Sequence, residues 1–109
     1  MLLNNQFYDL VSLSKEAVAH ICETFDQGAH TALNHARQAF ARDDREMLGR
    51  HAHALKGMCM NLGAETVGEH VAKLEGIAKA GSKKAITTEL STIEKLLKET
   101  QQEMRKALD

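Results

Sequence analysis

Apolar residues recur along most of this chain at intervals of three and four, the spacing that places side chains on one face of an α-helix. The pattern predicts four long helices, preceded by a short helical segment near residues 5–11. The first long helix follows Ser14, whose hydroxyl is a candidate N-cap, and ends near Ala41. Its apolar stripe consists of Val18, Ile21, Cys22, Phe25, Ala29, Ala32, Leu33, Ala36 and Phe40.

Capping signals mark the other three long helices. Asp43 is followed three residues later by Glu46, which is close to a capping box and predicts the start of the second long helix. Gly63 predicts its end, because glycine adopts the left-handed conformation that closes many helices. Gly81 ends the third long helix, and Ser82 can cap the fourth. The inward positions of these helices are Leu48, Ala52, Leu55, Cys59 and Leu62; Val67, Val71, Leu74 and Ala78; and Ile86, Leu90, Ile93, Leu97, Met104 and Leu108.

The connections between the predicted helices are only a few residues long. Short connections make neighbouring helices antiparallel. We therefore expect an all-α fold, an antiparallel up-down-up-down four-helix bundle with a short extra N-terminal helix. No internal repeat, low-complexity tract or linker is present, so we expect residues 1–109 to form a single domain.

The composition agrees with a helical protein and excludes several functions. The 109 residues include no proline, and 43% are apolar and 27% charged. A net charge of -1 without a basic block argues against a nucleic-acid partner, and no apolar run approaches the roughly 20 residues that span a bilayer. The N-terminus lacks a secretory signal, and two cysteines give no disulfide framework. We expect a reduced, cytoplasmic protein.

The stretch HAHALKGMCMNLGAE, residues 51–65, contains most of the candidate chemistry. On a helical wheel with His53 at zero, the apolar positions of this helix fall at roughly 180–260°, so His53 points away from the core. His51 falls at about 160°, too far round the helix to bind one metal ion together with His53. Met58, Cys59 and Met60 diverge by about 100° each, which argues against a copper site. The other four histidines fit no motif and are expected at the surface or half-buried: His20, His30, His35 and His70.

The face around His53 combines a nucleophile with a cation and bare backbone. An exposed neutral imidazole is an available nucleophile, and Lys56, one turn along at i+3, can reach an anion on the ring. Gly57 and Gly49 lie one turn to either side and would let the backbone of another protein approach closely. This set suggests phosphoryl transfer between docked proteins.

Two further residues on this face are candidates for partner binding. Met60 lies beside His53 on the wheel and could form an adaptable docking contact or be partly buried against a neighbouring helix. Arg50 can pair with Glu46 at i-4 or meet acidic groups of a partner. The sequence leaves both alternatives open.

The segment His53-Ala54-Leu55-Lys56-Gly57, followed by Leu62-Gly63-Ala64, resembles the signature of histidine-containing phosphotransfer (HPt) domains. That signature is H-x-L-K-G with a glycine ten residues after the histidine, and Leu74-Glu75 falls where the family usually has Leu-Glu or Leu-Gln. The resemblance covers the motif helix and the next one, and the four-helix plan fits the whole chain. Met58 and Cys59 depart from the small Ser or Ala residues that often follow Lys-Gly.

The resemblance implies that the chain accepts a phosphoryl group on His53 from a receiver-domain aspartate and passes it to another receiver aspartate. His53 would be the phosphoacceptor through Nε2, and Lys56 would offset the charge of the moving phosphoryl group. Glu75 could accept from Nδ1–H and orient the ring. No cofactor is expected, since the Mg²⁺ used in transfer belongs to the receiver. The expected partners are receiver domains of response regulators or hybrid histidine kinases, with the chain itself a monomer lacking kinase activity.

Two alternatives remain within this resemblance. A non-catalytic HPt-like module would bind a receiver or histidine kinase without transferring phosphate, although such a binder would not need the histidine. The phosphoacceptor domain of a chemotaxis-type kinase shares the histidine motif and is phosphorylated by the ATP-bound kinase. A chain that begins with Met and ends after one bundle favours a stand-alone protein, and a piece of a larger kinase is the alternative.

Overall fold

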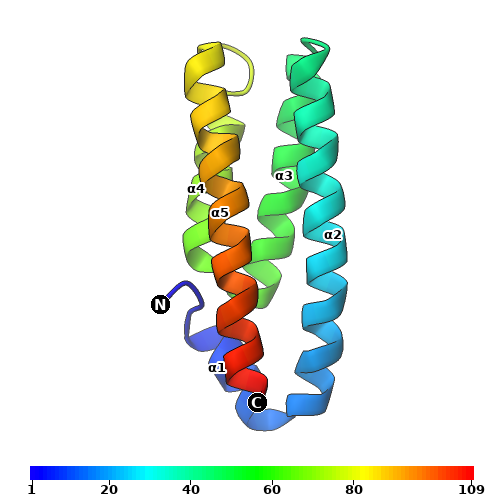
Figure 1. Cartoon of the computed structure of the whole chain (residues 1–109), viewed down its shortest axis with the longest axis vertical. Coiled ribbons are helices and arrows are strands. Elements are labelled where there is room, and N and C mark those ends of the chain that lie inside the picture. Colours follow the sequence, from blue (N-terminus) through cyan, green and yellow to red (C-terminus); the bar gives the residue numbers. More distant parts are fainter.

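The computed structural model describes all residues, 1–109, and contains five α-helices and no strand (Figure 1). These helices are α1 (Asn5–Leu13), α2 (Lys15–Ala41), α3 (Arg45–Leu62), α4 (Glu65–Ile77) and α5 (Lys83–Leu108). Successive long helices run antiparallel along a body of 43 × 21 × 17 Å, and α1 lies at one end (Figure 1). The predicted up-down-up-down bundle with a short N-terminal helix is confirmed. None of the helices has the length and apolar character needed to cross a membrane.

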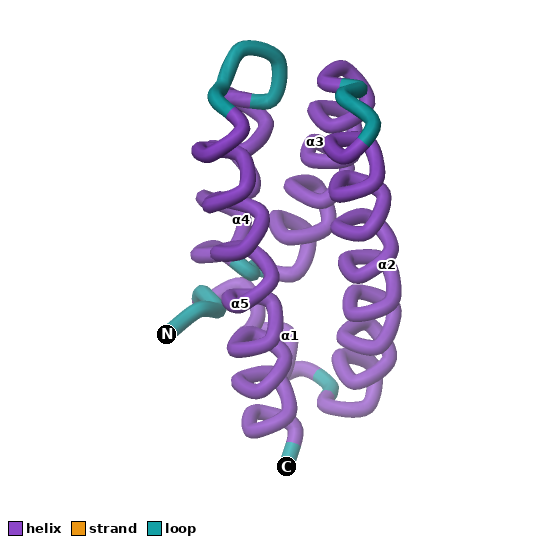
Figure 2. Tube along the Cα trace, turned by 45° about the horizontal axis from the view of Figure 1, so that its top comes forward, coloured by secondary structure: helices purple, strands orange, loops and turns teal.

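Side chains cap the N-termini of four of the five helices, all but α4. The hydroxyls of Ser14 and Ser82 accept hydrogen bonds from the backbone N–H of Ala17 and Ala85, as expected for N-caps. Gly63 closes α3 with φ of 86°, the left-handed conformation that glycine adopts without strain. Loops are confined to the N-terminal segment, the short turns between helices and the C-terminal residue (Figure 2).

The predicted cap of α3 is wrong by one residue. Asp44, not Asp43, is the N-cap, and its carboxylate accepts from the backbone N–H of Met47 at 3.1 Å. Asp43 instead has φ of 61° and closes α2, so that the N–H of Asp44 donates to the carbonyl of Ala39. Aspartate tolerates this left-handed conformation because its short polar side chain can bond locally.

The core follows the predicted apolar stripes closely. Every position predicted to face inward on α3 and α4 is buried. On α2, Ala39 is buried and Phe40 only partly so, while Ile21 at the edge of the stripe is 41% exposed. On α5, Leu108 is partly buried near the chain end, and Thr100 is buried with its hydroxyl bonded to the Leu96 carbonyl.

The first residues of the chain are tied to α5 through one carboxylate. Glu103 accepts hydrogen bonds from the backbone N–H groups of Leu2 and Leu3 and from the Tyr8 hydroxyl at 2.6 Å. Burial acts to raise the pKa of Glu103, but the bonds from Tyr8 and the two backbone amides hold it below its ordinary value. The same bond raises the pKa of Tyr8 to about 12.

Candidate functional site

His53 stands on the side of α3 opposite the core, with 70% of its side chain exposed. The buried positions of α3 lie on the other side of the helix, as the helical wheel predicts. Its ring lines a hollow of about 540 Å³ between α3 and the end of α4. The hollow is formed by Glu46, Gly49, Arg50, His53, Glu75, Gly76, Ala78 and Lys79.

Glu75 on α4 contacts both polar groups of the predicted site. Its Oε2 lies 2.8 Å from His53 Nδ1, and its Oε1 lies 2.7 Å from Lys56 Nζ. An ionised carboxylate can only accept a hydrogen bond. Nδ1 therefore carries a proton, and its N–H donates a hydrogen bond to Glu75. In the neutral ring, Nε2 then keeps its lone pair and is the nucleophilic nitrogen. The contact expected between Glu75 and Nδ1 is present.

The charge balance of this cluster favours an ionised carboxylate. The hydrogen bond from Lys56, together with that from His53, lowers the pKa of Glu75, and partial burial acts in the opposite direction. The Lys56 side chain is only 30% exposed and is bonded to Glu75, whereas the sequence suggested a free ammonium on an exposed face. One carboxylate therefore orients the imidazole and the ammonium together.

The two glycines beside His53 have different surroundings. A Cβ at Gly57 would meet nothing within 4 Å, so the backbone there is bare, as predicted. A Cβ at Gly49 would lie 3.5 Å from the Ala78 Cβ, because α3 and α4 pack closely at this level. An alanine would fit at Gly49 in ordinary contact with Ala78, so of these two glycines only Gly57 has open space at its Cβ position.

Arg50 and Met60 lie on different sides of the site. Arg50 lines the hollow and pairs with Glu46 at 3.0 Å, with both side chains 68% exposed. Met60 is 64% exposed, so it is not packed against a neighbouring helix. Met60 is not among the residues that line the hollow around His53. It lines a second groove, which also lies between α3 and α4.

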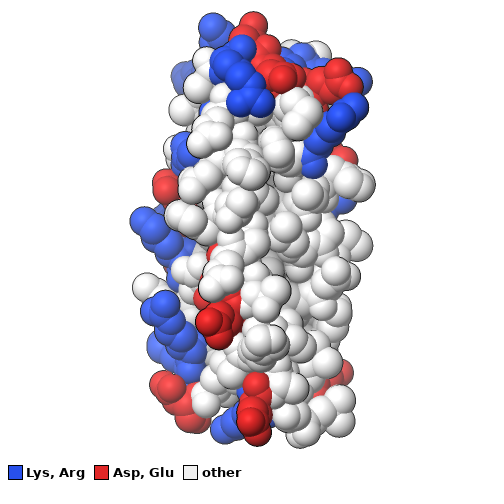
Figure 3. All heavy atoms as spheres, turned by 90° about the vertical axis from the view of Figure 1, so that its right-hand side faces the viewer, with Lys and Arg blue, Asp and Glu red and all other residues white.

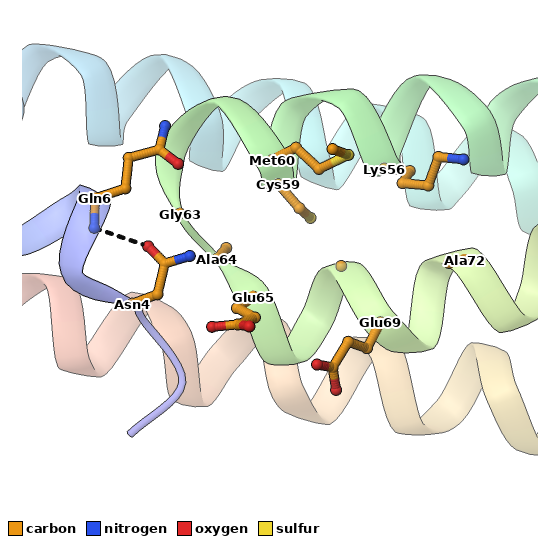
Figure 4. Close-up of a pocket in the computed structure, with 11 residues that line it drawn as sticks. Asn4, Gln6, Lys56, Cys59, Met60, Gly63, Ala64, Glu65, Glu69 and Ala72 are labelled. Carbon is orange, nitrogen blue, oxygen red and sulfur yellow. Dashed lines mark hydrogen bonds between the residues drawn. The ribbon is translucent and has the colours of Figure 1, made fainter.

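This second groove runs from Lys56 toward the N-terminal segment and has a volume of about 340 Å³ (Figure 4). Met60 and Cys59 line it from α3, and Glu65, Glu69 and Ala72 line it from α4 (Figure 4). Asn4 and Gln6 stand at its far end, next to Gly63 (Figure 4). Lys56 is thus the residue that the groove shares with the His53–Glu75 cluster.

Sequence reasoning did not identify Lys79, which lines the hollow beside His53. It lies in the turn that follows α4, four residues after Glu75. That i+4 spacing on the same helix face was the available signal. The hollow is therefore bordered by two cations, Arg50 and Lys79, in addition to Lys56 behind Glu75.

The two cysteine thiols are unsuited to nucleophilic chemistry. Both cysteines are free and buried. Burial raises the pKa of Cys59 to about 12, and burial with the nearby Asp26 carboxylate raises that of Cys22 to about 11. Both thiols therefore stay protonated at neutral pH. No group of three or more His, Cys, Asp or Glu side chains is placed to hold a metal ion.

The side of α2 differs from the hollow in having few charges. In Figure 3, which faces α2, most Lys, Arg, Asp and Glu side chains gather toward the ends and one edge, and apart from an acidic group below the centre the middle of the face is uncharged. Exposed uncharged residues of α2 include Ile21, Thr24, Gln27 and Thr31. Such a surface can be covered by a partner without desolvating many ions.

A comparison with protein families gives one match. The family model described as Hpt domain matches residues 16–105, a range that contains α3 and α4 and nearly all of α2 and α5. No curated protein and no solved structure matches the chain at a significant level.

Proposed function

The chain belongs to the Hpt domain family, and on this premise we propose that it is a phosphorelay carrier whose phosphoacceptor is His53 Nε2. Membership implies histidine phosphotransfer in phosphorelay signalling. One observation carries the choice of residue: His53 is the exposed imidazole whose Nδ1 is bonded to a carboxylate that also binds an ammonium. His70 also contacts a carboxylate, Glu89, but only 28% of its side chain is exposed.

The proposed reaction needs no proton transfer to or from solvent. The lone pair of His53 Nε2 attacks the phosphorus of an aspartyl phosphate, the bond from phosphorus to the aspartate oxygen breaks, and a P–N bond forms. The aspartate leaves as a carboxylate, and Nδ1 keeps its proton. The ring is then formally positive, and Glu75 offsets this charge through its existing 2.8 Å contact. Transfer to the next aspartate is the reverse of these steps.

Lys56 supplies the positive charge on the phosphoryl side of the proposed reaction. In the phosphate-free protein its Nζ is 2.7 Å from Glu75 Oε1. The flexible four-carbon stem allows the ammonium to move toward phosphoryl oxygens, whose negative charge attracts it. Gly57 supports the same proposal, since its bare backbone allows a receiver domain to approach.

We propose receiver domains of response regulators or of hybrid histidine kinases as the partners. The Mg²⁺ needed for transfer would be held by the receiver, and this chain would act as a monomer without kinase activity of its own. The two free, buried cysteines suit a reducing cytoplasm.

The test of the phosphoacceptor uses a receiver domain carrying labelled aspartyl phosphate. Wild-type protein should take up acid-labile, alkali-stable phosphate, and His53→Gln should take up none. His70→Gln is the matched control, since it also removes an imidazole bonded to a carboxylate, and it should be labelled like wild type. Labelling of His53→Gln at the wild-type level would refute the assignment, and receiver binding without labelling of wild type would indicate a non-catalytic module.

The test of the proposed cation is Lys56→Ala. Transfer should slow, because no ammonium then offsets the negative charge of the phosphoryl group, and Glu75 loses its contact with Lys56 Nζ. Circular dichroism and urea unfolding should show a folded bundle, since α3 keeps its buried face. Transfer at the wild-type rate would exclude a role for the Lys56 charge.

A further inference from the structure

Two histidines face each other across the hairpin of α2 and α3. His35 on α2 and His51 on α3 have ring centroids 5.1 Å apart, with ring planes inclined at 55°. Each lies eight residues from Asp43 in the turn, so the antiparallel helices bring them to the same level. The juxtaposition therefore follows from the geometry of the hairpin.

Neither of these rings has a hydrogen-bond partner in the protein, unlike three of the other imidazoles. His30 contacts Asn34, and His53 and His70 each contact a glutamate. His35 is exposed and His51 is half-buried. Both also line a hollow of about 480 Å³ between α2 and α3, whose other lining residues are uncharged. The ring nitrogens of the pair are thus left free to bind an ion that enters from solvent.

We propose that His35 and His51 together bind a transition-metal ion of the Zn²⁺ or Cu²⁺ class, which bridges α2 and α3. Imidazole nitrogens are preferred ligands of these ions and poor ligands for Mg²⁺ or Ca²⁺. Two imidazoles bound to one tetrahedral Zn²⁺ at about 2.0–2.1 Å have ring centres about 5 Å apart. The separation of 5.1 Å matches this arrangement. Water would complete the coordination, since no third protein ligand is placed nearby.

The surroundings of His51 suit metal binding. Burial lowers the pKa of His51, and His35 and Arg42 act in the same direction, while Asp44 acts against them. The His51 ring is therefore neutral at physiological pH, the state that a metal ligand requires. Acid should weaken binding, because protons and the metal compete for the same nitrogens.

The proposed metal site is separate from the phosphotransfer site. His51 and His53 project from α3 about 200° apart, so one ion cannot bind both. A metal that binds only the folded hairpin would stabilise it by RT ln(1 + [M]/Kd), so the melting temperature would rise with the logarithm of the free metal concentration above Kd. The bridge would lie on the α2–α3 side of the molecule, and the His53 hollow lies between α3 and α4.

The test is to titrate the untagged full chain with ZnCl₂ alone. Isothermal titration calorimetry measures the binding, and thermal unfolding measures the melting temperature at each ZnCl₂ concentration. Wild type should bind one ion per chain with a rise in melting temperature. His35→Ala and His51→Ala should each weaken binding by more than about tenfold, since even lost supporting residues have effects of that size at metal sites. His35 is exposed, so its replacement should leave the fold unchanged.

Two controls distinguish this site from other histidines. His20→Ala removes another exposed imidazole of α2, and His53→Gln removes the proposed phosphoacceptor; both should bind Zn²⁺ like wild type. Electron paramagnetic resonance with Cu²⁺ should show two coordinated nitrogens in wild type and fewer in His51→Ala. Absence of saturable binding to wild type, or unchanged binding in either His35→Ala or His51→Ala, would overturn the proposal. Loss of binding in His53→Gln would assign the ion to the phosphotransfer cluster instead.

Discussion

At the scale of single residues, the carboxylate of Glu75 fixes the state of its two neighbours. It holds the proton of His53 on Nδ1 and keeps Lys56 beside the ring, at 2.8 and 2.7 Å. Hydrogen bonds to charged groups contribute about 1.5–3 kcal/mol, enough to select one tautomer of an otherwise exposed imidazole. The reactivity proposed for Nε2 therefore depends on a side chain from the neighbouring helix.

Replacing Glu75 should change the tautomer and the rate together. In Glu75→Ala the population with Nδ1 protonated should fall and transfer to His53 should slow, because neither the ring nor the developing positive charge is supported. Glu75→Gln keeps an acceptor without the charge, so it should preserve the tautomer and still slow transfer. Long-range ¹H–¹⁵N spectra of the imidazole report the tautomer, and single-turnover transfer reports the rate. An unchanged tautomer in Glu75→Ala would exclude Glu75 as the orienting residue.

Lys79 should contribute a smaller electrostatic effect. It borders the hollow around His53 but is exposed, and exposed charges typically contribute less than about 1 kcal/mol. Lys79→Ala should slow phosphoryl uptake by about two- to fivefold at low salt, within that limit, and by less at high salt because of screening. Lys73→Ala is the matched control, since it removes a cation of α4 that lies outside the hollow. Equal rates for the two variants would exclude a specific role.

The predictions for single residues were confirmed where helix geometry alone determines the direction of a side chain. The wheel placed His53 outward and His51 near the core edge, since both angles depend only on position in α3. The bond from Lys56 to Glu75 was not predictable, because it depends on how α3 packs against α4. The same holds for Met60, whose place in the second groove depends on α4 and the N-terminal segment.

At the scale of elements, α3 combines a sealed apolar face with an exposed reactive one. Its buried residues are spaced for helix packing, and Gly57 interrupts the opposite face without any neighbouring atom near its Cβ position. A glycine inside a helix lowers stability by roughly 1 kcal/mol relative to alanine. Nothing in the packing of the isolated chain requires this glycine.

Gly57→Ala should therefore separate stability from activity. The variant should unfold at higher urea concentration, with a gain of about 1 kcal/mol from helix propensity. Transfer from a receiver should nevertheless slow, because the added methyl group stands where the partner approaches under the proposed function. Urea unfolding and single-turnover transfer on the same sample provide the check. A variant that is both more stable and equally fast would show that the bare backbone has no role in docking.

Element boundaries were predictable where a side chain or glycine marks them. Ser14, Ser82 and Gly63 mark their helix ends as expected. The N-cap of α3 was predicted one residue too early, at Asp43, because either of two consecutive aspartates could cap the helix. The backbone hydrogen bonds that end α2 determine that Asp44 is the cap. The end of α4 at Ile77 lies before Gly81, since the chain leaves the helix through a turn at residues 78–80.

At the scale of the whole molecule, Glu103 joins the two ends of the chain. It accepts from Leu2, Leu3 and Tyr8, about a hundred positions earlier in sequence. The bundle architecture could be predicted from apolar periodicity and short loops. This contact could not, since the sequence shows no pattern linking residues so far apart. The N-terminal segment also reaches the turn after α3, where the N–H of Asn4 donates to the Gly63 carbonyl at 2.9 Å.

Glu103→Gln should destabilise the fold in a pH-dependent way. The pKa of Glu103 is lowered in the folded state, so its contribution is present above the unfolded carboxyl pKa and is lost as the pH falls through the folded value. At pH 7 the variant should lose about 1–3 kcal/mol, because the part-buried donors of Leu2, Leu3 and Tyr8 lose a charged acceptor, and the difference should shrink in acid. Urea unfolding across pH measures it.

Tyr8 provides an independent readout of the same contact. It is the only tyrosine and the chain has no tryptophan, so its ultraviolet titration is unobscured. The pKa of about 12 in wild type should fall toward 10.0 in Glu103→Gln, because the bond to the carboxylate is its main cause. If the Tyr8 titration were unchanged in Glu103→Gln and the difference in stability did not depend on pH, the role given to the Glu103 carboxylate would be contradicted.

The imidazole, ammonium and carboxylate of the site all belong to the single hairpin of α3 and α4, which meets at Gly63. The outer helices α2 and α5 supply apolar cover but none of these groups. Substitutions at the solvent-facing positions of α2 and α5 can therefore leave the contacts among these three groups unchanged. Under the proposed function, such substitutions would change the surface offered to a partner and leave the His53–Glu75–Lys56 cluster as it is.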